Sequence, residues 1–168
     1  DYSESCNAKI LTSLSIIDGQ IDVDSLPKAN VDLNKFEKYV LKENDVLMTT
    51  KSTKVKVSVA NNLGDIPIIP IGGMIMIRTR PEMLDPYYLK IFLENKTGQE
   101  LLKTIQTGTS IVNINIGSLK TLKVACPPID KQAKVKEQYL LKLNELNKVR
   151  KELEKITEEL STIYDKSK

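Results

Sequence analysis

The sequence predicts an α+β fold: a compact, mixed or antiparallel, β-rich domain with short helices over 1–128, then one long C-terminal coiled-coil helix over 129–168. Two observations divide the chain there. Short apolar segments that alternate with polar residues, separated by turn residues, fill the first part. A Lys/Glu-rich stretch without Gly or Pro follows Pro127-Pro128. With 40% hydrophobic residues in 168, the first part can build a core.

Short strands and turns are expected in the first 50 residues. Asp18-Gly19 predicts a turn between two short strands, and residues 27–34 are expected to form a loop. Residues 45–50 (DVLMTT) predict a strand.

Two more strands are expected before residue 81. Val55, Val57 and Val59 alternate with polar residues, which predicts a strand with one apolar face and lysines on the other. Residues 72–80 (GGMIMIRTR) predict a further, more buried strand.

Two helices should follow, each with a capping signal. Asp85 before Pro86 is a favourable N-cap with proline at the first helical position. Thr97 and Glu100 have the spacing of a capping box, and Gly108 is expected to end that second helix. Strands are then predicted over 112–116, where apolar residues alternate with asparagines, and around 122–125.

A heptad pattern characterises residues 130–164. The apolar positions expected to contact a partner helix are Val135, Tyr139, Leu146, Val149, Leu153, Ile156, Leu160 and Ile163, with Lys142 as the polar exception. About 35 residues extend about 50 Å, which is longer than a domain of this size can cover. A helix folded back on its own domain is the alternative.

Composition excludes several classes of site. The chain has no histidine, and its two cysteines are 120 positions apart, so no zinc site, His-dependent triad or other metal site is expected. The most apolar stretch, 66–77, is broken by Pro and Gly and is shorter than the ~20 residues of a membrane span. We therefore expect a cytoplasmic protein without a signal peptide, membrane contact or cofactor.

Positive charge is concentrated after residue 50. Residues 1–50 carry 5 Lys/Arg against 9 Asp/Glu, residues 51–130 carry 10 against 6, and residues 131–168 carry 10 against 7. This excess is compatible with a polyanionic partner, and an ordinary solvated surface would explain it as well.

Catalytic signals are weak. DPYY, residues 85–88, is similar to the Asp-Pro-Pro-Tyr signature of adenine amino-methyltransferases, but the second proline and a Gly-rich cofactor turn are missing. A helix start explains the same residues. No other carboxylate pair or activated nucleophile is evident, so no enzyme is predicted.

Two polar segments have the composition of a DNA-contacting surface. In TTKSTKVKV (49–57), lysines can pair with phosphates, and hydroxyls can bond phosphates or base edges. In and after QTGTS (106–110), Gln and Asn can bond adenine edges, although both segments could be plain turns. The candidates for DNA contact are Lys51, Ser52, Thr53, Lys54, Lys56, Gln106, Thr109, Ser110, Asn113 and Asn115.

The order of these features is similar to that of a known family. DVLMTTKSTKVKVSVA, the later segment from DPYYL to PPIDKQ and the following helix together resemble the specificity subunit of type I restriction-modification enzymes. The resemblance covers one target recognition domain and one helical spacer, from about Asp45 onward. Asn44, Ser52 and Cys126 depart from the family's usual Gly, Gly and Leu.

The resemblance implies a function and partners. In such subunits each recognition domain binds one half of a split double-stranded DNA target without catalysis. Methyltransferase (modification) and restriction subunits are separate chains. The helix after Pro127-Pro128 would pack antiparallel against that of a second recognition half, so this chain would be a half-subunit or an excised half. Pairing with its own copy, a homodimer, would make the target an interrupted palindrome, whereas a different half would make it asymmetric.

Two other hypotheses remain open at this point. The chain could be an assembly module whose coiled coil is its whole function, without DNA recognition. It could also be a degenerate adenine methyltransferase, which would bind S-adenosylmethionine.

Overall fold

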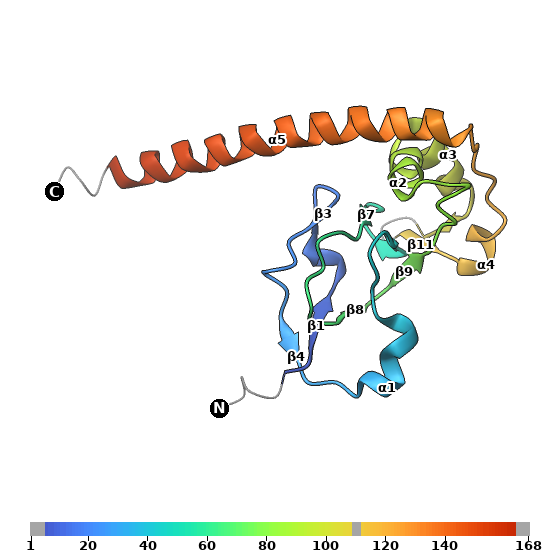
Figure 1. Cartoon of the computed structure of the whole chain (residues 1–168), viewed down its shortest axis with the longest axis horizontal. Coiled ribbons are helices and arrows are strands. Elements are labelled where there is room, and N and C mark those ends of the chain that lie inside the picture. Colours follow the sequence, from blue (N-terminus) through green and yellow to red (C-terminus); the bar gives the residue numbers. More distant parts are fainter. Residues whose placement is uncertain (1–5, 109–111, 164–168) are drawn as a thin grey trace.

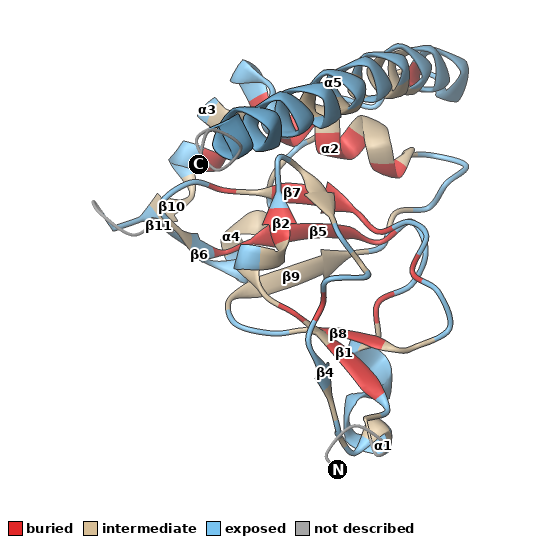
Figure 2. Cartoon of the chain, turned by 90° about the vertical axis from the view of Figure 1, so that its left-hand side faces the viewer, coloured by how far each residue is buried: buried red, intermediate tan, exposed pale blue. Residues whose placement is uncertain are grey.

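Four consecutive buried residues form the central strand of the domain, β5 (Val46–Thr49). It pairs antiparallel with β7 (Val57–Val59) and with β9 (Met74–Ile77), giving the order β7-β5-β9 (Figure 2). Successive side chains of a strand point to opposite faces. Val46 and Met48 accordingly enter one hydrophobic cluster and Leu47 enters another, so both faces of this sheet are covered.

The first cluster lies between the sheet and two helices, α2 (Pro86–Glu94) and α3 (Lys96–Thr104). Asp85 caps α2 as predicted, because its carboxylate accepts hydrogen bonds from the backbone N–H groups of Tyr87 and Tyr88. Leu89, Phe92 and Leu93 then lie on the buried face.

The second cluster lies toward the sheet β4-β1-β8, formed by β1 (Ala8–Leu11), β4 (Lys28–Ala29) and β8 (Ile68–Pro70). β1 pairs antiparallel with β4 and parallel with β8, so the sheet is mixed. After the 3-10 turn η1 (Ser13–Ser15), the strands β2 (Ile16–Ile17) and β3 (Gln20–Ile21) form a hairpin. Asp18 and Gly19 both have positive φ, 51° and 73°, which confirms the predicted turn.

A third small sheet has the order β10-β11-β6, with β10 (Gln106–Thr107), β11 (Val112–Ile114) and β6 (Lys51–Ser52). The short helices α1 (Leu33–Phe36), η2 (Glu37–Tyr39) and α4 (Ile116–Leu119) complete the domain. The computed structural model describes residues 6–108 and 112–163. Its small sheets, short helices and long final helix confirm the predicted α+β class (Figure 1).

The long helix α5 (Ile129–Ile163) begins directly after Pro128 and runs past the domain (Figure 1). Its first part packs on α2 and on the β2–β3 hairpin, whereas residues 151–163 are all exposed. The helix therefore combines both predicted alternatives: it lies on its own domain at one end and projects at the other. In the described residues, no helix has the length and apolar character needed to cross a membrane.

Several local predictions were wrong, and each error has a structural cause. β9 is only half-buried, not more buried than its neighbours, because its residues line a groove that is open to solvent, whereas β7, also an edge strand, is fully buried. Residues 122–125 form no strand, although Leu122 and Val124 do pack on the first cluster. Part of the expected loop 27–34 pairs as β4, because Lys28 and Ala29 lie opposite β1.

The region 95–116 also differs from the prediction. α3 starts at Lys96 with Asn95 as its cap, not at Thr97, and it ends at Thr104 rather than at Gly108. Gly108, with φ 90°, instead follows β10. The strand expected over 112–116 stops at Ile114, because Asn115 caps α4.

Candidate nucleic-acid interface

The sheet β10-β11-β6 brings the two predicted DNA-contact segments together. In its register Asn113 lies opposite both Lys51 and Thr107, and Gln106 lies opposite Ile114. β6 is separated from β11 by about 60 positions in the sequence, so this pairing is tertiary and could not be read from local patterns. Four predicted residues, Lys51, Ser52, Gln106 and Asn113, thus share one small sheet.

This sheet is anchored to the core by Thr50. Its backbone N–H and its hydroxyl both donate to the carbonyl of Gly73, at 2.7 and 2.9 Å, and its own carbonyl accepts from Ile114 N–H at 2.9 Å. Thr50 is buried, so β6 and β11 are held at the end of the central sheet. The exposed groups on them therefore stand on a fixed support.

A tight turn follows β6 at residues 53–54. The Ser52 hydroxyl lies 2.6 Å from the carbonyl oxygen of Lys54 and donates to it. The Thr49 hydroxyl lies 3.0 Å from the Ser52 hydroxyl and accepts from Lys56 N–H at 2.9 Å. Ser52 thus shapes the turn, which leaves Thr53 and Lys54 exposed at its tip.

The three predicted lysines have different environments. Lys51 and Lys54 are exposed, and neither forms an ion pair within the described residues. The Lys56 ammonium donates instead to the carbonyls of Ser13 and Ile16, at 2.9 and 2.8 Å. Lys56 therefore ties the β2–β3 region to the central sheet.

The predicted Asn and Thr residues also differ in their surroundings. Asn113 is exposed on β11, whereas the Asn115 side-chain oxygen accepts from Gly117 and Ser118 N–H as the cap of α4. Thr109 and Ser110 lie outside the described residues. Thr107, exposed and opposite Asn113, belongs to the same surface and was missed. Its position in QTGTS was the available signal.

The predicted coiled-coil positions fall into two groups. Val135 and Tyr139 are half-buried on the part of α5 that packs on the domain. The remaining six form an exposed apolar stripe, each with at least 44% of its surface exposed: Leu146, Val149, Leu153, Ile156, Leu160 and Ile163.

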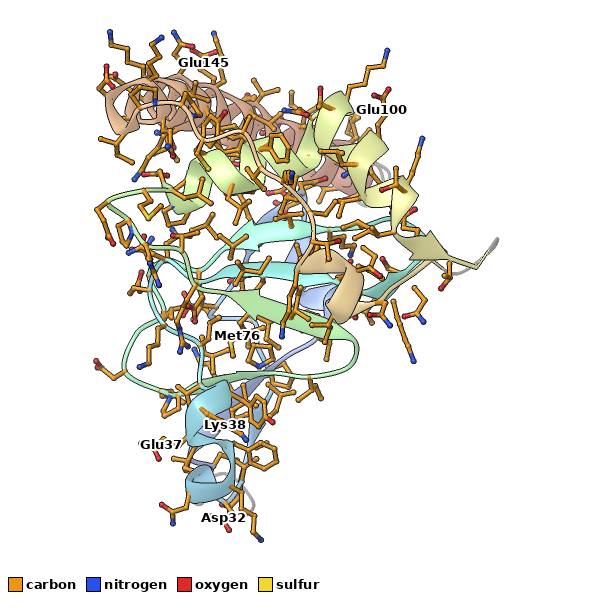
Figure 3. The ribbon with its side chains drawn as sticks, turned by 90° about the vertical axis from the view of Figure 1, so that its right-hand side faces the viewer. Asp32, Glu37, Lys38, Met76, Glu100 and Glu145 are labelled. Atoms are coloured by element: carbon orange, nitrogen blue, oxygen red, sulfur yellow. The ribbon has the colours of Figure 1, made fainter. Side chains whose placement is uncertain are left out.

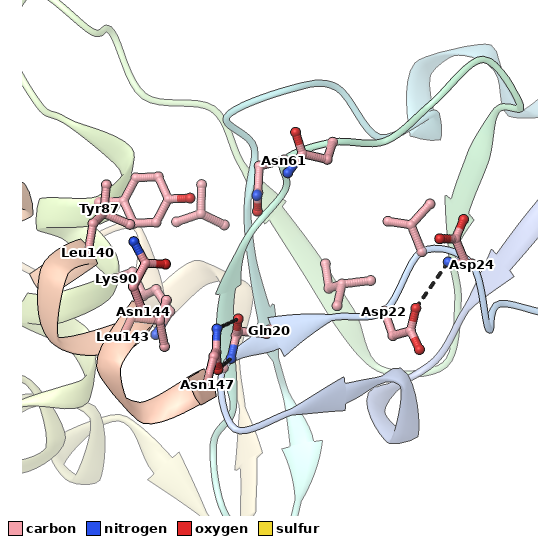
Figure 4. A pocket seen from close by; sticks show the side chains of 15 residues that line it. Gln20, Asp22, Asp24, Asn61, Tyr87, Lys90, Leu140, Leu143, Asn144 and Asn147 are labelled. Carbon is pink, nitrogen blue, oxygen red and sulfur yellow. Dashed lines mark hydrogen bonds between the residues drawn. The ribbon is translucent and has the colours of Figure 1, made fainter. Parts of the chain in front are cut away.

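Side-chain contacts hold the first part of α5 at a fixed angle. Gln20 and Asn147 exchange two amide hydrogen bonds, at 3.0 and 3.1 Å, at the edge of a cavity of about 440 Å³ (Figure 4). Arg150 forms an ion pair with Asp18 at 2.8 Å. Together these contacts join the hairpin turn to the middle of the helix.

A second anchor lies at α2. Lys90, only 2% exposed, donates to the Tyr139 hydroxyl at 2.8 Å and pairs with Glu94. Lys136 pairs with Asp85 at 3.1 Å and lies 5.2 Å from the centre of the Tyr87 ring.

These contacts also explain the DPYY sequence. The Asp85 carboxylate caps α2 and pairs with Lys136 of α5, and Pro86 occupies the first helical position. The helix-start interpretation is confirmed. Over the described residues, no three His, Cys, Asp or Glu side chains gather where a metal ion could be held.

Comparison with known families decides the assignment. The model of the type I restriction modification DNA specificity domain matches residues 18–158, which is well over half of the chain. The chain belongs to this family. A search of curated proteins finds no match.

As a type I specificity domain, the chain belongs to a non-catalytic subunit, and its role is DNA target recognition within a restriction-modification system. The family implies DNA and the modification and restriction subunits as partners. The matched range includes both the sheet β10-β11-β6 and most of α5.

Proposed function

We propose that this specificity domain recognises one half of a split double-stranded DNA target and delivers it to a separate adenine methyltransferase and restriction subunit. The observation that carries the proposal is the sheet β10-β11-β6, in which Lys51, Thr107 and Asn113 lie opposite one another on one face, while Ser52 and Gln106 belong to the same sheet with their side chains on the other face. Lys51 and Lys54 contact phosphates, and Asn113, with Gln106 and Thr53, contacts base edges. Thr109 and Ser110 belong to the same segment between β10 and β11 and are included in the proposal.

Three of the predicted residues use their side chains to hold the backbone around this surface in place. Ser52 and Asn115 hold the turn and the start of α4 through their side chains, and Lys56 holds the carbonyls of Ser13 and Ile16. We include all three as DNA contacts. For Lys56 and Asn115, the groups that these bonds do not use are the third ammonium hydrogen and the side-chain NH₂, respectively.

The exposed stripe of α5 gives the proposed assembly. Leu146, Val149, Leu153, Ile156, Leu160 and Ile163 pack against the same stripe of a second recognition half in an antiparallel coiled coil, and a second copy of this chain is the partner we favour. Because the first part of α5 is fixed on the domain, the helix pair sets the distance between the two DNA-reading surfaces.

The first test is selection of bound duplexes from a random library, with excess competitor DNA at moderate salt. We expect enrichment of a short motif, mirrored across a fixed gap if two copies pair. If the chain enriches no motif alone or with a methyltransferase subunit, it is an assembly module without DNA recognition and the proposal is wrong.

The lysine assignments have a sharper test. Lys51→Ala and Lys54→Ala should each lower affinity for all duplexes and reduce the slope of log K against log salt by about one unit. Lys28→Ala, which removes an exposed lysine from a different sheet, is the matched control. Slopes equal to that of the control would remove both lysines from the interface.

Base reading by Asn113 is tested separately. Asn113→Ala should cost about 1–3 kcal/mol at one base pair and relax the preference there, while the salt slope stays unchanged. If Asn113→Ala instead lowers affinity equally for all DNA sequences, Asn113 contacts the DNA backbone and not a base.

A further inference from the structure

The outer edge of β9 has backbone groups without a hydrogen-bond partner among the described residues. β9 pairs only with β5 among the described strands, so it forms one border of the sheet β7-β5-β9. Thr50 N–H donates to Gly73, and antiparallel pairs alternate between bonded and non-bonded. In the register of Met48 with Ile75, the N–H and C=O groups of Met74 and Met76 therefore point away from β5.

This edge lies along an apolar groove of about 800 Å³. One wall comes from α2, α4 and the extended segment after it, including Leu89, Leu119 and Leu122; the opposite wall includes Tyr39 and Pro70. The groove is open to solvent: Ile116 is 54% exposed and Tyr39 47%. Figure 3 shows β9 in front on this side of the molecule, between α4 and the helical turn that carries Lys38.

The charge at the groove's border is positive. Lys38 and Lys120 line it, and no ion pair of either is present in the described residues. Arg78 also lines it but is neutralised, because it forms two hydrogen bonds with the buried carboxylate of Asp45, at 2.7 and 2.9 Å. Two uncompensated lysines thus border an apolar strip.

We propose that this groove binds an extended, acidic segment of a partner polypeptide, which adds to the sheet as a strand beside β9. A strand supplies alternating N–H and C=O groups as hydrogen-bond partners for those of Met74 and Met76. A helix cannot, because its backbone groups are already bonded to one another. Apolar side chains at every second position of the segment fill the groove. Acidic residues at its ends pair with Lys38 and Lys120.

The placement also fits what is known of sheet edges. Exposed edges with apolar surroundings aggregate unless they are covered, and folded proteins usually protect them with charge, proline, bulges or another segment. β9 has no proline within it and no bulge in its register with β5. A bound segment covers the edge.

The test uses displayed random nonapeptides selected on the whole chain, with counter-selection on the Lys38→Glu/Lys120→Glu double variant. We expect peptides with alternating apolar residues and at least two acidic ones. DNA is absent, so the result is independent of the proposed DNA recognition. Peptides without such alternation, or none at all, would overturn the proposal.

Backbone pairing is then tested on one selected peptide made synthetically. N-methylation at alternate residues should weaken binding roughly tenfold or more when the methylated amides face β9, and leave it unchanged in the other register. Binding should slow hydrogen exchange at the Met74 and Met76 amides.

The charge requirement has its own control. The double variant should bind the same peptide roughly tenfold more weakly. Lys103→Glu reverses an exposed lysine of α3 outside the groove and should not change binding. Equal affinity for both variants, or fast exchange at both methionine amides in the complex, would exclude strand addition at β9.

Discussion

Gln132, near the start of α5, is a buried polar residue whose side chain forms three hydrogen bonds. It is 0% exposed; its amide nitrogen donates to the carbonyls of Met83 and Pro127, at 2.9 and 2.7 Å, and its oxygen accepts from Asp85 N–H at 2.8 Å. One side chain therefore joins the segment before α2, the double proline and the long helix. The angle at which α5 leaves the domain depends on these three bonds.

Gln132→Ala should lower the free energy of unfolding by about 3 kcal/mol, because it leaves buried backbone groups without partners and opens a small cavity. Urea denaturation measures this change. Gln138→Ala, an exposed glutamine of the same helix, should change stability by less than about 0.5 kcal/mol. A loss below about 1 kcal/mol for Gln132→Ala would show that water replaces its bonds.

Tyr87 gives a prediction for alkaline pH. Burial first, and then the nearby Tyr139 and Asp85, raise the pKa of Tyr87 above the usual value of about 10. The native state therefore holds this proton more tightly, so its contribution to stability is complete below about pH 10 and is lost as pH rises through the raised pKa.

The free energy of unfolding should thus fall more steeply above about pH 10 in the native sequence than in Tyr87→Phe, by at most about 1.4 kcal/mol per pH unit. Denaturation of both proteins between pH 9 and 11 measures the difference. Parallel curves would mean that Tyr87 titrates alike in the folded and unfolded chains.

At this scale, local chemistry was predictable and distant partners were not. The Asp85 cap was predicted because an N-cap bonds N–H groups two and three residues away. Lys56 was assigned to DNA from its neighbours in sequence, yet its ammonium contacts carbonyls about 40 positions earlier. No local pattern contains that contact.

At the scale of elements, the start of α3 shows how packing overrides a capping signal. Asn95 accepts from Gly98 N–H, and α3 begins directly after α2 with one residue between them. A Cβ at Gly98 would lie 1.9 Å from the Phe92 carbonyl oxygen, so the two helices approach at a point where only glycine fits. That contact goes with an N-cap at Asn95, two residues before Thr97, and a helix that starts at Lys96.

Asn95→Ala should therefore destabilise the protein by about 1 kcal/mol, the usual cost of a lost N-cap. Thr97→Ala is the matched control and should have an effect below about 0.5 kcal/mol, because Thr97 is exposed inside the helix. Thermal or urea unfolding distinguishes them. If Thr97→Ala instead destabilised the protein more than Asn95→Ala, Thr97 would be the N-cap.

The type of an element could be predicted where its periodic pattern was long. Predictions from short patterns were less reliable. The heptad fixed α5 to within about one residue at its start, and the four apolar residues of VLMT marked β5. Leu122 to Ala125 has strand-like composition but pairs with no strand in the part of the chain that the structure describes, since composition cannot specify pairing. The sheet β10-β11-β6 was missed for the same reason, although its members were singled out by polarity.

At the scale of the whole molecule, the chain combines a fixed domain and a projecting helix. Leu153 and Leu160 are each 62% exposed on the projecting part, and Ile156 45%. A row of large apolar side chains on a solvent-exposed helix face indicates a partner helix.

If two copies of the chain pair through this stripe, as proposed, Leu153→Glu with Ile156→Glu should raise the dissociation constant of self-association at least roughly 100-fold, because two charges would enter an apolar interface. Sedimentation equilibrium measures it. Glu152→Ala, beside the stripe, should leave it nearly unchanged, and all three substitutions should leave domain stability intact, because residues 151–163 are exposed. Equal association of both variants would place the dimer contact elsewhere.

The pair formed by Gln20 and Asn147 also bears on how the chain folds during synthesis. The two residues are 127 positions apart, and Arg150 and Asp18 are slightly further apart in the sequence. At about 5–20 residues per second, the ribosome delivers Asn147 several seconds or more after Gln20. During that interval the hairpin can form its local backbone pairing but not these two contacts. The β2–β3 hairpin, which is synthesised early, is therefore among the last parts of the described fold to gain all of its contacts.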